Sequence, residues 1–291
     1  MATLSQWVGG SRPRTLPSAI APVAIGAGLA ARLDSFMFNR VVLALIVALA
    51  LQIGVNFSND YSDGIKGTDE VRIGPVRLVG QKLAEPNHVK VAAFLCYFVA
   101  MAAGFGLVLM TSQWWLMLVG IACVAAAWFY TGGQRPYGYI GLGEVFVFIF
   151  FGLVPVIGTV YVQTLSVSGA DVVAACAIGL IICTLLIVNN LRDIPTDTQA
   201  GKHTLAVRLG DRGTRILYLV FIALAFALTM VLAALTTWWL LFGLLSFIFA
   251  IKPVRIVISG AVGPMLIIPL KQSGLLILIY GLSCAALLAW A

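Results

Sequence analysis

Nine apolar stretches, each close to the length that crosses a bilayer, run through this chain. They lie at residues 15–33, 41–60, 88–110, 114–131, 144–162, 171–191, 215–235, 237–251 and 274–291. A hydrocarbon core about 30 Å thick needs a helix of about 20 apolar residues. Only 10% of the residues are charged, whereas a soluble domain has about 25% charged residues. The sequence therefore predicts an all-α, polytopic membrane protein in which residues 1–291 form a single domain of nine transmembrane helices.

Basic residues gather on one side of the predicted membrane. When the nine helices alternate in direction, Arg32 and Arg40 fall on one side and the rest of the 18 Lys and Arg residues fall on the other. An excess of Lys and Arg marks the cytoplasmic side of a membrane protein. The sequence therefore predicts a cytoplasmic N-terminus, in the plasma membrane, with the long loops on the cytoplasmic side.

Two matching sets of amides and carboxylates stand at the cytoplasmic ends of the second and sixth stretches. Each set follows helical spacing, which places its members on one face of a helix. Asn189 and Asp193 follow Asn56 and Asp60 at one constant spacing in the chain. This repeat favours two copies of a four-helix unit with one helix added. The members of the two sets are Asn56, Asn59, Asp60, Asp63, Asn189, Asn190, Asp193 and Asp197.

Four carboxylates close together repel one another unless cations lie between them. Oxygen ligands in this number suit Mg2+, which keeps several waters and bridges to substrate phosphates. We therefore predict that Asp60, Asp63, Asp193 and Asp197 are catalytic and bind Mg2+, with Asn56, Asn59 and Asn189 beside them at the substrate. The alternative is that these acids are solvated loop residues that pair with Arg192 or Lys66.

The loops after these sets are basic. Lys66, Lys202 and Arg135 are predicted to neutralise a diphosphate, because cations stabilise phosphate groups by charge-assisted hydrogen bonds. The ordinary cytoplasmic excess explains most of the other loop cations, such as Arg72 and Arg77. Arg14, at the start of the first stretch, is expected either to bind an anion or to anchor the helix at the lipid headgroups.

A Gly- and Pro-rich segment, residues 130–139, ends the fourth stretch. Its Tyr137 and Tyr139 are predicted either to line a substrate pocket, where they shield a cation, or to belong to the interfacial aromatic belt. Glu144 follows at the start of the fifth stretch, where an acidic residue favours the helix N-terminus. The sequence has no P-loop, Rossmann or HExxH motif, and it gives no reason to expect a nucleic-acid partner.

The two acidic sets resemble the NDxxDxxxD and DxxxD motifs of the UbiA superfamily of intramembrane aromatic prenyltransferases. The matching strings are Asn59-Asp60-Tyr61-Ser62-Asp63 and Asp193-Ile194-Pro195-Thr196-Asp197. The second string continues with Gly201, Thr204 and Leu205, similar to the family's DxxxDxxxGxxTL. The first departs from the family pattern, because Gly67 stands where a third carboxylate is expected and the next acid is Asp69.

Three longer strings resemble the 1,4-dihydroxy-2-naphthoate prenyltransferases of menaquinone synthesis within this superfamily. They lie at residues 12–17, 74–78 and 130–139. The resemblance implies helices around a central cavity, Mg2+ as cofactor, and transfer of a polyprenyl group from its diphosphate to the naphthoate with decarboxylation, giving demethylmenaquinone. The partners would then be a polyprenyl diphosphate, an aromatic acid and the lipid bilayer.

Two alternatives to this function stay open at the level of the sequence. A sister prenyltransferase would act on 4-hydroxybenzoate, homogentisate, haem or chlorophyllide with the same acidic motifs. A cation-coupled transporter would also have intramembrane acids and internal repeats, although its acids would be expected at the midplane of the membrane.

Overall fold

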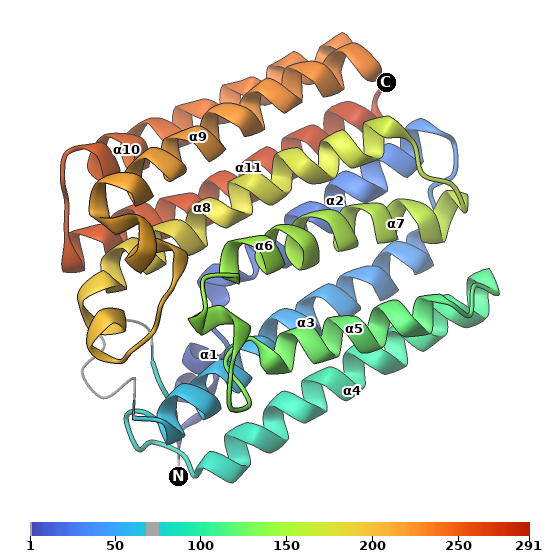
Figure 1. The fold of residues 1–291 in the computed structure, drawn as a ribbon. Helices are drawn as coiled ribbons and strands as arrows, with labels where there is room; N and C mark the ends of the chain where they lie inside the picture. Colours follow the sequence, from blue (N-terminus) through green and yellow to red (C-terminus); the bar gives the residue numbers. More distant parts are fainter. Residues whose placement is uncertain (1, 68–75) are drawn as a thin grey trace.

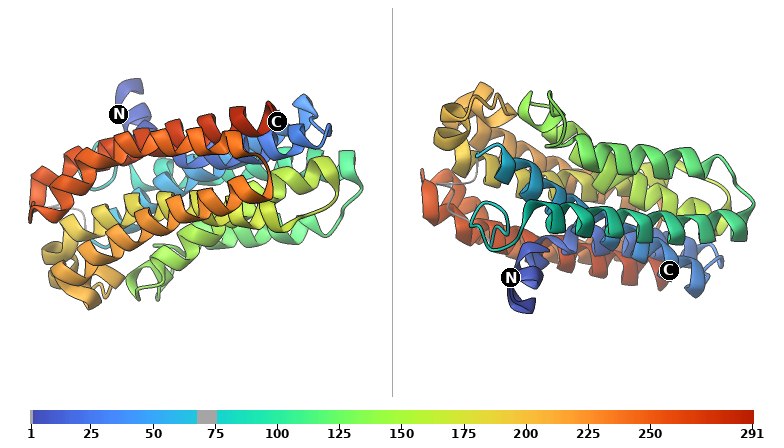
Figure 2. Two further views of the ribbon diagram at one scale, coloured as in Figure 1. Left: turned by 90° about the horizontal axis from the view of Figure 1, so that it is seen from above. Right: turned by 90° about the horizontal axis from the view of Figure 1, so that it is seen from below.

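The computed structural model describes residues 2–67 and 76–291, and this part of the chain contains helices and loops without a β-strand. The helices lie side by side in one bundle, and the two termini lie at opposite ends of it (Figures 1 and 2). The predicted all-α class is therefore confirmed. Thr68 to Pro75, with Asp69, Arg72 and the start of the string at 74–78, lie outside the described residues.

The helical elements follow the predicted stretches in order. They are α1 (Leu4–Gly10), η1 (Pro13–Thr15), α2 (Pro17–Arg32), α3 (Phe38–Ile65), α4 (Pro86–Thr111), α5 (Leu116–Phe129), η2 (Tyr137–Tyr139), α6 (Gly143–Val147), η3 (Phe148–Leu153), α7 (Val154–Thr164), α8 (Gly169–Gln199), α9 (Leu205–Leu235), η4 (Trp238–Phe247), α10 (Ile248–Ile258), η5 (Gly263–Leu266) and α11 (Ile267–Ala289).

Within the described part of the chain, 7 helices are long and apolar enough to cross a membrane, or 8 when the bent pair Leu4–Thr15 and Pro17–Arg32 counts as one span. The remaining predicted stretch falls on α5, which has only 14 residues. Large apolar side chains such as Phe98 and Leu118 are 71% and 70% exposed, as expected for a surface that faces lipid. The exact count of nine spans stays a prediction.

Three helix boundaries differ from the prediction. Helix α8 continues past the predicted end of its stretch at residue 191 to Gln199, and it carries Asp193 and Asp197 on helical backbone, as their spacing predicted. Helix α9 begins at Leu205 and bends at Gly210, whose φ of 67° is left-handed. The predicted stretch 237–251 ends too early, because α10 continues to Ile258 with Pro253 inside it; membrane helices tolerate proline where neighbouring groups satisfy the freed backbone.

The tightest helix contact joins the first and last long helices. A Cβ atom on Gly281 of α11 would lie 2.3 Å from the Cβ of Ala21 in α2, and one on Gly28 would lie 2.5 Å from the carbonyl oxygen of Ala285. Small residues let membrane helices approach closely. The other extensive pairs are α3 with α4 and α8 with α9, so each helix that carries an acidic set packs on the helix that follows it.

The two arginines expected on the side away from the acidic sets both bind the ends of helices. Arg32 Nη2 donates to the carbonyl of Thr236, just after α9, at 3.1 Å. Arg40 donates to the carbonyl of Val162 at 2.7 Å and to that of Met110 at 3.1 Å. Cations stabilise the negative ends of helices. These contacts explain why the membrane tolerates two basic residues on this side.

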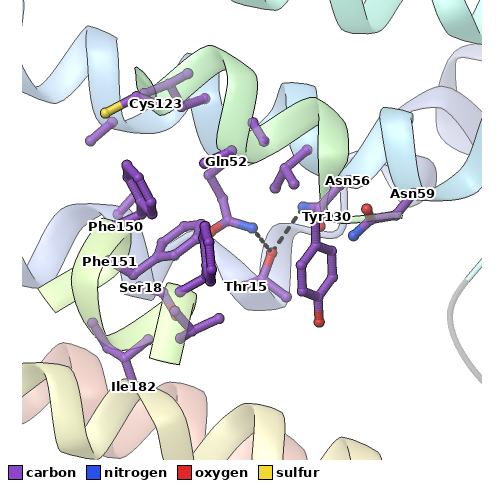
Figure 3. Close-up of a pocket in the computed structure, with 18 of the residues that line it drawn as sticks. Thr15, Ser18, Gln52, Asn56, Asn59, Cys123, Tyr130, Phe150, Phe151 and Ile182 are labelled. Atoms are coloured by element: carbon purple, nitrogen blue, oxygen red, sulfur yellow. Dashed lines mark hydrogen bonds between the residues drawn. The ribbon is translucent and has the colours of Figure 1, made fainter. Parts of the chain in front are cut away.

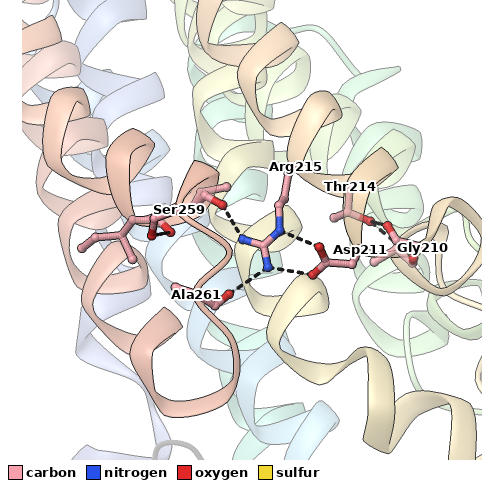
Figure 4. Close-up of polar contacts among 9 residues, drawn as sticks. Gly210, Asp211, Thr214, Arg215, Ser259 and Ala261 are labelled. Carbon is pink, nitrogen blue, oxygen red and sulfur yellow. Dashed lines mark hydrogen bonds and ion pairs between the residues drawn. The ribbon is translucent and has the colours of Figure 1, made fainter.

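A buried arginine joins α9 to the end of α10. Arg215 makes two 2.7 Å contacts with Asp211, one turn earlier in the same helix, and donates to the carbonyl of Ala261 at 2.9 Å. It also donates to the carbonyl of Val257. Figure 4 shows the guanidinium group between the two segments. Arg215 thus fixes the turn that leads into α11.

Candidate active site

A cavity of about 810 Å³ lies inside the bundle, between the helices that carry the two acidic sets. Its polar end is lined by residues from the last turns of α3 and α8, and its apolar part continues toward Ala44 of α3 and Phe105 of α4. Figure 3 shows Asn56, Asn59 and Tyr130 at one part of the wall and Phe150 and Phe151 at another. The cavity is therefore polar at one end and apolar along the rest of its length.

The α3 wall presents Asn56, Asn59 and Asp63 to the cavity. Asn56 Nδ2 donates to Thr15 Oγ1 at 3.0 Å and to the carbonyl of Ser11 at 2.9 Å. Gln52 Nε2 donates to the same Thr15 oxygen at 3.0 Å (Figure 3). Asn59 Oδ1 accepts from Thr131 Oγ1 at 2.8 Å. The amides of α3 are thus held by the segment before α2 and by the end of α5.

The α8 wall presents Asn189, Asn190, Arg192 and Asp197. Arg192 Nη2 donates to Asn189 Oδ1 at 2.8 Å. The same guanidinium forms two bonds with Asp193, from Nε at 2.6 Å and from Nη2 at 2.8 Å. Asp193 is 4% exposed and is not among the residues that line the cavity. Its carboxylate holds Arg192, which does line it.

Asp60 has a structural partner of a different kind. Its two carboxylate oxygens accept from the backbone N–H groups of Leu78 at 2.6 Å and Val79 at 3.1 Å. The side chain is 1% exposed and is absent from the cavity wall. Of the four predicted metal ligands, the described structure therefore brings Asp63 and Asp197 to the cavity and places Asp60 and Asp193 behind it.

The side chains of the two predicted lysines, Lys66 and Lys202, both lie near the ring of Tyr139 at the polar end. Lys202 Nζ lies 3.5 Å from Asp63 Oδ1 and 4.4 Å from the centre of the Tyr139 ring. Lys66 Nζ lies 5.0 Å from the same ring and donates to the carbonyls of Thr131 at 2.7 Å and Gly133 at 3.2 Å. Partial burial lowers the pKa of Lys66; Asp63 opposes this shift and Lys202 adds to it. Lys202 lines the cavity, whereas Lys66 does not line it and binds the backbone of the loop after α5.

Arg135 is exposed and is not part of the cavity wall. Its neighbour Tyr137 does line the cavity, with its hydroxyl donating to the carbonyl of Ala126 at 2.6 Å and its ring 3.8 Å from that of Phe146. Arg14 also lines the cavity. Arg135 and Tyr137 lie in the same segment, residues 130–139, but only Tyr137 faces the cavity.

Several cavity residues were not among the predicted site residues. The cations among them come from different parts of the chain, and the aromatic ones come from the end of α5 and from α6 and η3: Arg12, Arg77, Arg192, Lys271, Tyr130, Phe146 and Phe150. Their basic or aromatic character is visible in the sequence. Only the folded bundle, however, separates them from residues of the same type that face lipid or water.

Glu144 was expected to cap a helix, and it does lie in the first turn of α6. It is also 4% exposed, and its Oε1 accepts from Asn190 Nδ2 at 3.0 Å. Its Oε2 is buried without a hydrogen-bond partner. Glu144 therefore does not line the cavity but binds Asn190, which does.

The donor set at the polar end fits Mg2+. The described residues contain no group of three or more His, Cys, Asp and Glu side chains that could hold a metal by themselves. Asp63 and Asp197 nevertheless line the cavity together with Asn56 and Asn190. Because Mg2+ usually takes one or two carboxylates and completes its shell with water and substrate phosphates, a two-carboxylate site is compatible with a diphosphate-bound ion.

Comparison with known proteins gives consistent results. A model described as the UbiA prenyltransferase family matches residues 19–260. A protein of Mycobacterium tuberculosis named 1,4-dihydroxy-2-naphthoate octaprenyltransferase is 51% identical over 290 residues, covering 100% of this chain and 99% of the relative. A protein of Mycobacterium leprae with the same name is 49% identical, covering 100% of this chain and 98% of the relative.

Solved structures share the fold. A UbiA homologue from Archaeoglobus fulgidus, bound to GPP and Mg2+, superposes with a TM-score of 0.69 at 12% identity, covering 97% of this chain and 99% of the other. An apo UbiA homologue from Aeropyrum pernix gives a TM-score of 0.72 at 14% identity, covering 91% and 96%. At these identities the likeness concerns the arrangement of the helices.

Proposed function

Because the chain belongs to the UbiA prenyltransferase family, we propose that it transfers a polyprenyl group from polyprenyl diphosphate to 1,4-dihydroxy-2-naphthoate, with loss of the carboxyl group as CO2. The product is a demethylmenaquinone. Relatives that are 51% and 49% identical over the full chain carry the name of this activity. The structural observation that carries the proposal is one cavity with carboxylates and cations at one end and apolar walls along the rest.

The polar end suits the diphosphate. Lys202 and the guanidinium groups of Arg12, Arg14, Arg77 and Arg192 line it, and fixed cations stabilise the charge of a leaving pyrophosphate. Mg2+ held there by Asp63 and Asp197 would neutralise further charge on the leaving group. The roles of Asp60 and Asp193 as direct ligands stay predictions, because both carboxylates are engaged in the bonds described above.

The apolar part suits the prenyl chain. Cavity residues on α3 extend from Asp63 back to Ala44, a distance of roughly 28 Å at the helical rise of about 1.5 Å per residue. That length approaches the hydrocarbon thickness of about 30 Å. A prenyl chain whose diphosphate lies near Asp63 therefore fits along α3 with its tail in the membrane interior.

The reacting carbon would lie where these two parts meet. The C–O bond of the prenyl diphosphate breaks, pyrophosphate leaves, and the ring carbon of the naphthoate forms the new C–C bond as CO2 departs. Tyr130 and Phe150 line this region (Figure 3), and aromatic faces stabilise a developing cation. The apolar walls exclude water, which would otherwise capture the allylic cation.

The protein is a multi-pass membrane protein, and we place it in the plasma membrane with the Asp63 end of the bundle toward the cytoplasm. The basic excess at this end supports that orientation. With an odd number of spans, the C-terminus would lie on the opposite face from the N-terminus. Reporter fusions at the two termini test this orientation, and reporters on the same face would contradict it.

The activity test uses the purified protein with Mg2+, a panel of prenyl diphosphates and a panel of aromatic acids, with products identified by mass. We expect a prenylated, decarboxylated naphthoate, and no product in excess EDTA. A product from 4-hydroxybenzoate alone would leave the family assignment intact and overturn the acceptor. Cation flux in liposomes without any prenylated product would favour the transporter alternative.

A further inference from the structure

Glu144 and Asn190 form a buried hydrogen bond across the cavity wall. Asn190 Nδ2, on α8, donates to Glu144 Oε1, on α6, at 3.0 Å. Glu144 is 4% exposed and Asn190 is 7% exposed. Asn190 lines the cavity and Glu144 does not. Glu144 therefore touches the cavity only through Asn190.

This bond fixes which end of the Asn190 amide the cavity meets. Nδ2 is the donor and Glu144 Oε1 the acceptor, so the amide NH2 group faces Glu144. The carbonyl oxygen Oδ1 then faces away from Glu144, on the side where Asn190 lines the cavity. Neighbouring Asn189 is different, because its Oδ1 is taken by Arg192 at 2.8 Å. The wall thus presents a hydrogen-bond acceptor at Asn190.

An acceptor at this position discriminates between the two substrates. Diphosphate and carboxylate oxygens are themselves acceptors, so a carbonyl oxygen offers them nothing. A ring hydroxyl is a donor and would bind Oδ1 directly. The naphthoate substrate of the proposed function carries two hydroxyl groups, whereas the prenyl diphosphate carries none.

The cavity that Asn190 lines also has aromatic side chains that suit a flat ring. Tyr130 and Phe150 line the cavity together with Asn190, and Phe146 stacks on Tyr137 with ring centres 3.8 Å apart. The segment that follows Phe146, η3, is a π-helical turn over Phe148–Leu153. Such turns change the register of a helix and are frequent at functional sites. Phe146 and Phe150, four residues apart on either side of the start of this turn, stack with ring centres 5.8 Å apart, and both line the cavity.

We propose that Asn190 Oδ1 accepts a hydrogen bond from a ring hydroxyl of the aromatic acceptor, and that Glu144 is the positioning residue that fixes the Asn190 amide for this contact. The inference rests on the proposed function, since it concerns the acceptor of the same reaction. It assigns the acceptor to the wall formed by α6, η3 and the adjoining turn of α8, and the diphosphate to the end beyond Asp197.

The test is steady-state kinetics on Asn190→Ala, Glu144→Met, Glu144→Gln and the Glu144→Met/Asn190→Ala double variant, with each substrate varied in turn. Loss of one hydrogen bond of about 1.4 kcal/mol corresponds to about a tenfold change. We expect Asn190→Ala and Glu144→Met each to raise KM for the naphthoate about tenfold and to leave KM for the prenyl diphosphate unchanged. Glu144→Gln retains an acceptor oxygen and should behave like the wild type.

The double variant separates positioning from an independent role. If Glu144 acts through Asn190, adding Glu144→Met to Asn190→Ala changes nothing further. The matched control is Gln163→Met, which removes another buried polar side chain, bound to the backbone of Met37 at 2.8 Å, from the far end of the same helical segment. This control should leave both KM values unchanged.

Three results would overturn the inference. They are an increase in KM for the prenyl diphosphate in place of the naphthoate, multiplied effects in the double variant, and a Glu144→Gln variant as impaired as Glu144→Met. If Glu144→Met does not fold, Asn190→Ala and Glu144→Gln still decide, because the first must raise KM for the naphthoate and the second must not. Turnover of the naphthoate by the wild type is measured separately, and its absence would overturn the proposed function.

Discussion

Tyr139 donates its hydroxyl hydrogen to Asp63 Oδ1 over 2.5 Å, and this bond joins the loop after α5 to the last turn of α3. Lys202 and Lys66 contact the ring of the same tyrosine, at 4.4 Å and 5.0 Å from its centre. One aromatic side chain thus orients a carboxylate of the cavity and gathers two cations from separate loops. The polar end of the site is a network rather than a row of independent ligands.

The Tyr139→Phe variant tests this network. It keeps the ring that both lysines contact and removes the hydrogen bond to Asp63, which is worth about 1–1.5 kcal/mol. We expect kcat/KM for the prenyl diphosphate to fall about tenfold, and a larger fall for Tyr139→Leu, which also removes the aromatic face. Tyr161→Phe is the matched control, because its hydroxyl donates to Gln113 at 3.1 Å and is outside the cavity wall. Equal rates in Tyr139→Phe and the wild type would contradict this assignment.

Lys202 and Arg135 were both predicted to neutralise the diphosphate, and a comparison of their variants tests which of them does so. Lys202 is 5% exposed at the cavity, whereas Arg135 is exposed outside it. We expect Lys202→Met to lower kcat/KM for the prenyl diphosphate by at least tenfold, since a charge-assisted bond to phosphate contributes about 1.5–3 kcal/mol. Arg135→Met should change it less than twofold. Kinetic measurements that reverse this order would place the diphosphate on the exposed side of the loop.

Asp60 and Asp63 should differ in what their loss does to the protein. Asp60→Ala leaves the N–H groups of Leu78 and Val79 without their acceptors, and each buried unpaired group costs about 1–3 kcal/mol. We expect Asp60→Ala to lose turnover and also to lower the midpoint of thermal unfolding. Asp63→Ala should lose turnover with a smaller fall in the midpoint, because its partners Tyr139 and Lys202 line the cavity, where water can replace the lost carboxylate.

Thermal unfolding followed by fluorescence in detergent measures both variants. Asp171→Asn serves as the control. The carboxylate of Asp171 accepts from the backbone N–H of Ser168 at 2.7 Å at the N-terminus of α8, the opposite end of that helix from Asp193 and Asp197. It should retain turnover. An unchanged unfolding midpoint in Asp60→Ala would instead favour a direct metal role for Asp60.

The sequence was sufficient for the class of fold, and residues of its two polar sets line one cavity in the structure. Long apolar stretches leave the backbone few alternatives to helices in lipid, and the spacing of Asn56, Asp63, Asn189 and Asp197 placed them on two helix faces that the bundle brings to one cavity. The family resemblance, carried by the same motifs, is confirmed by the match over residues 19–260.

The sequence could not predict which of the carboxylates line the cavity and which bind other groups of the protein. Asp60 and Asp63 look equivalent in the motif and lie only about 60° apart around the helix, but Asp60 binds the backbone of the loop at Leu78 and Asp63 lines the cavity. The hydrogen bond between Glu144 and Asn190 joins residues far apart in the chain, and neither segment has a sequence pattern that predicts this contact. Such contacts depend on tertiary packing, which periodicity does not encode.

Arg215 offers a test of stability that is separate from catalysis. Its side chain pairs with Asp211 and binds the carbonyls of Val257 and Ala261 at the end of α10 (Figure 4). Arg215→Met removes these contacts and leaves the two carbonyls without this donor, which should cost roughly 2–3 kcal/mol. Asp211 is 57% exposed and can be solvated, so its loss of a partner adds little.

We therefore expect Arg215→Met to lower the midpoint of thermal unfolding and to retain kcat at a temperature where the variant is folded. Arg212→Met is the matched control, because Arg212 is an exposed arginine in the same helix. Its unfolding midpoint should equal that of the wild type. If the two variants unfold at the same temperature, the contact between α9 and the end of α10 contributes nothing measurable to stability. If Arg215→Met is stable but inactive, the turn before α11, and with it Lys271 at the cavity, depends on Arg215 for its position rather than for its stability.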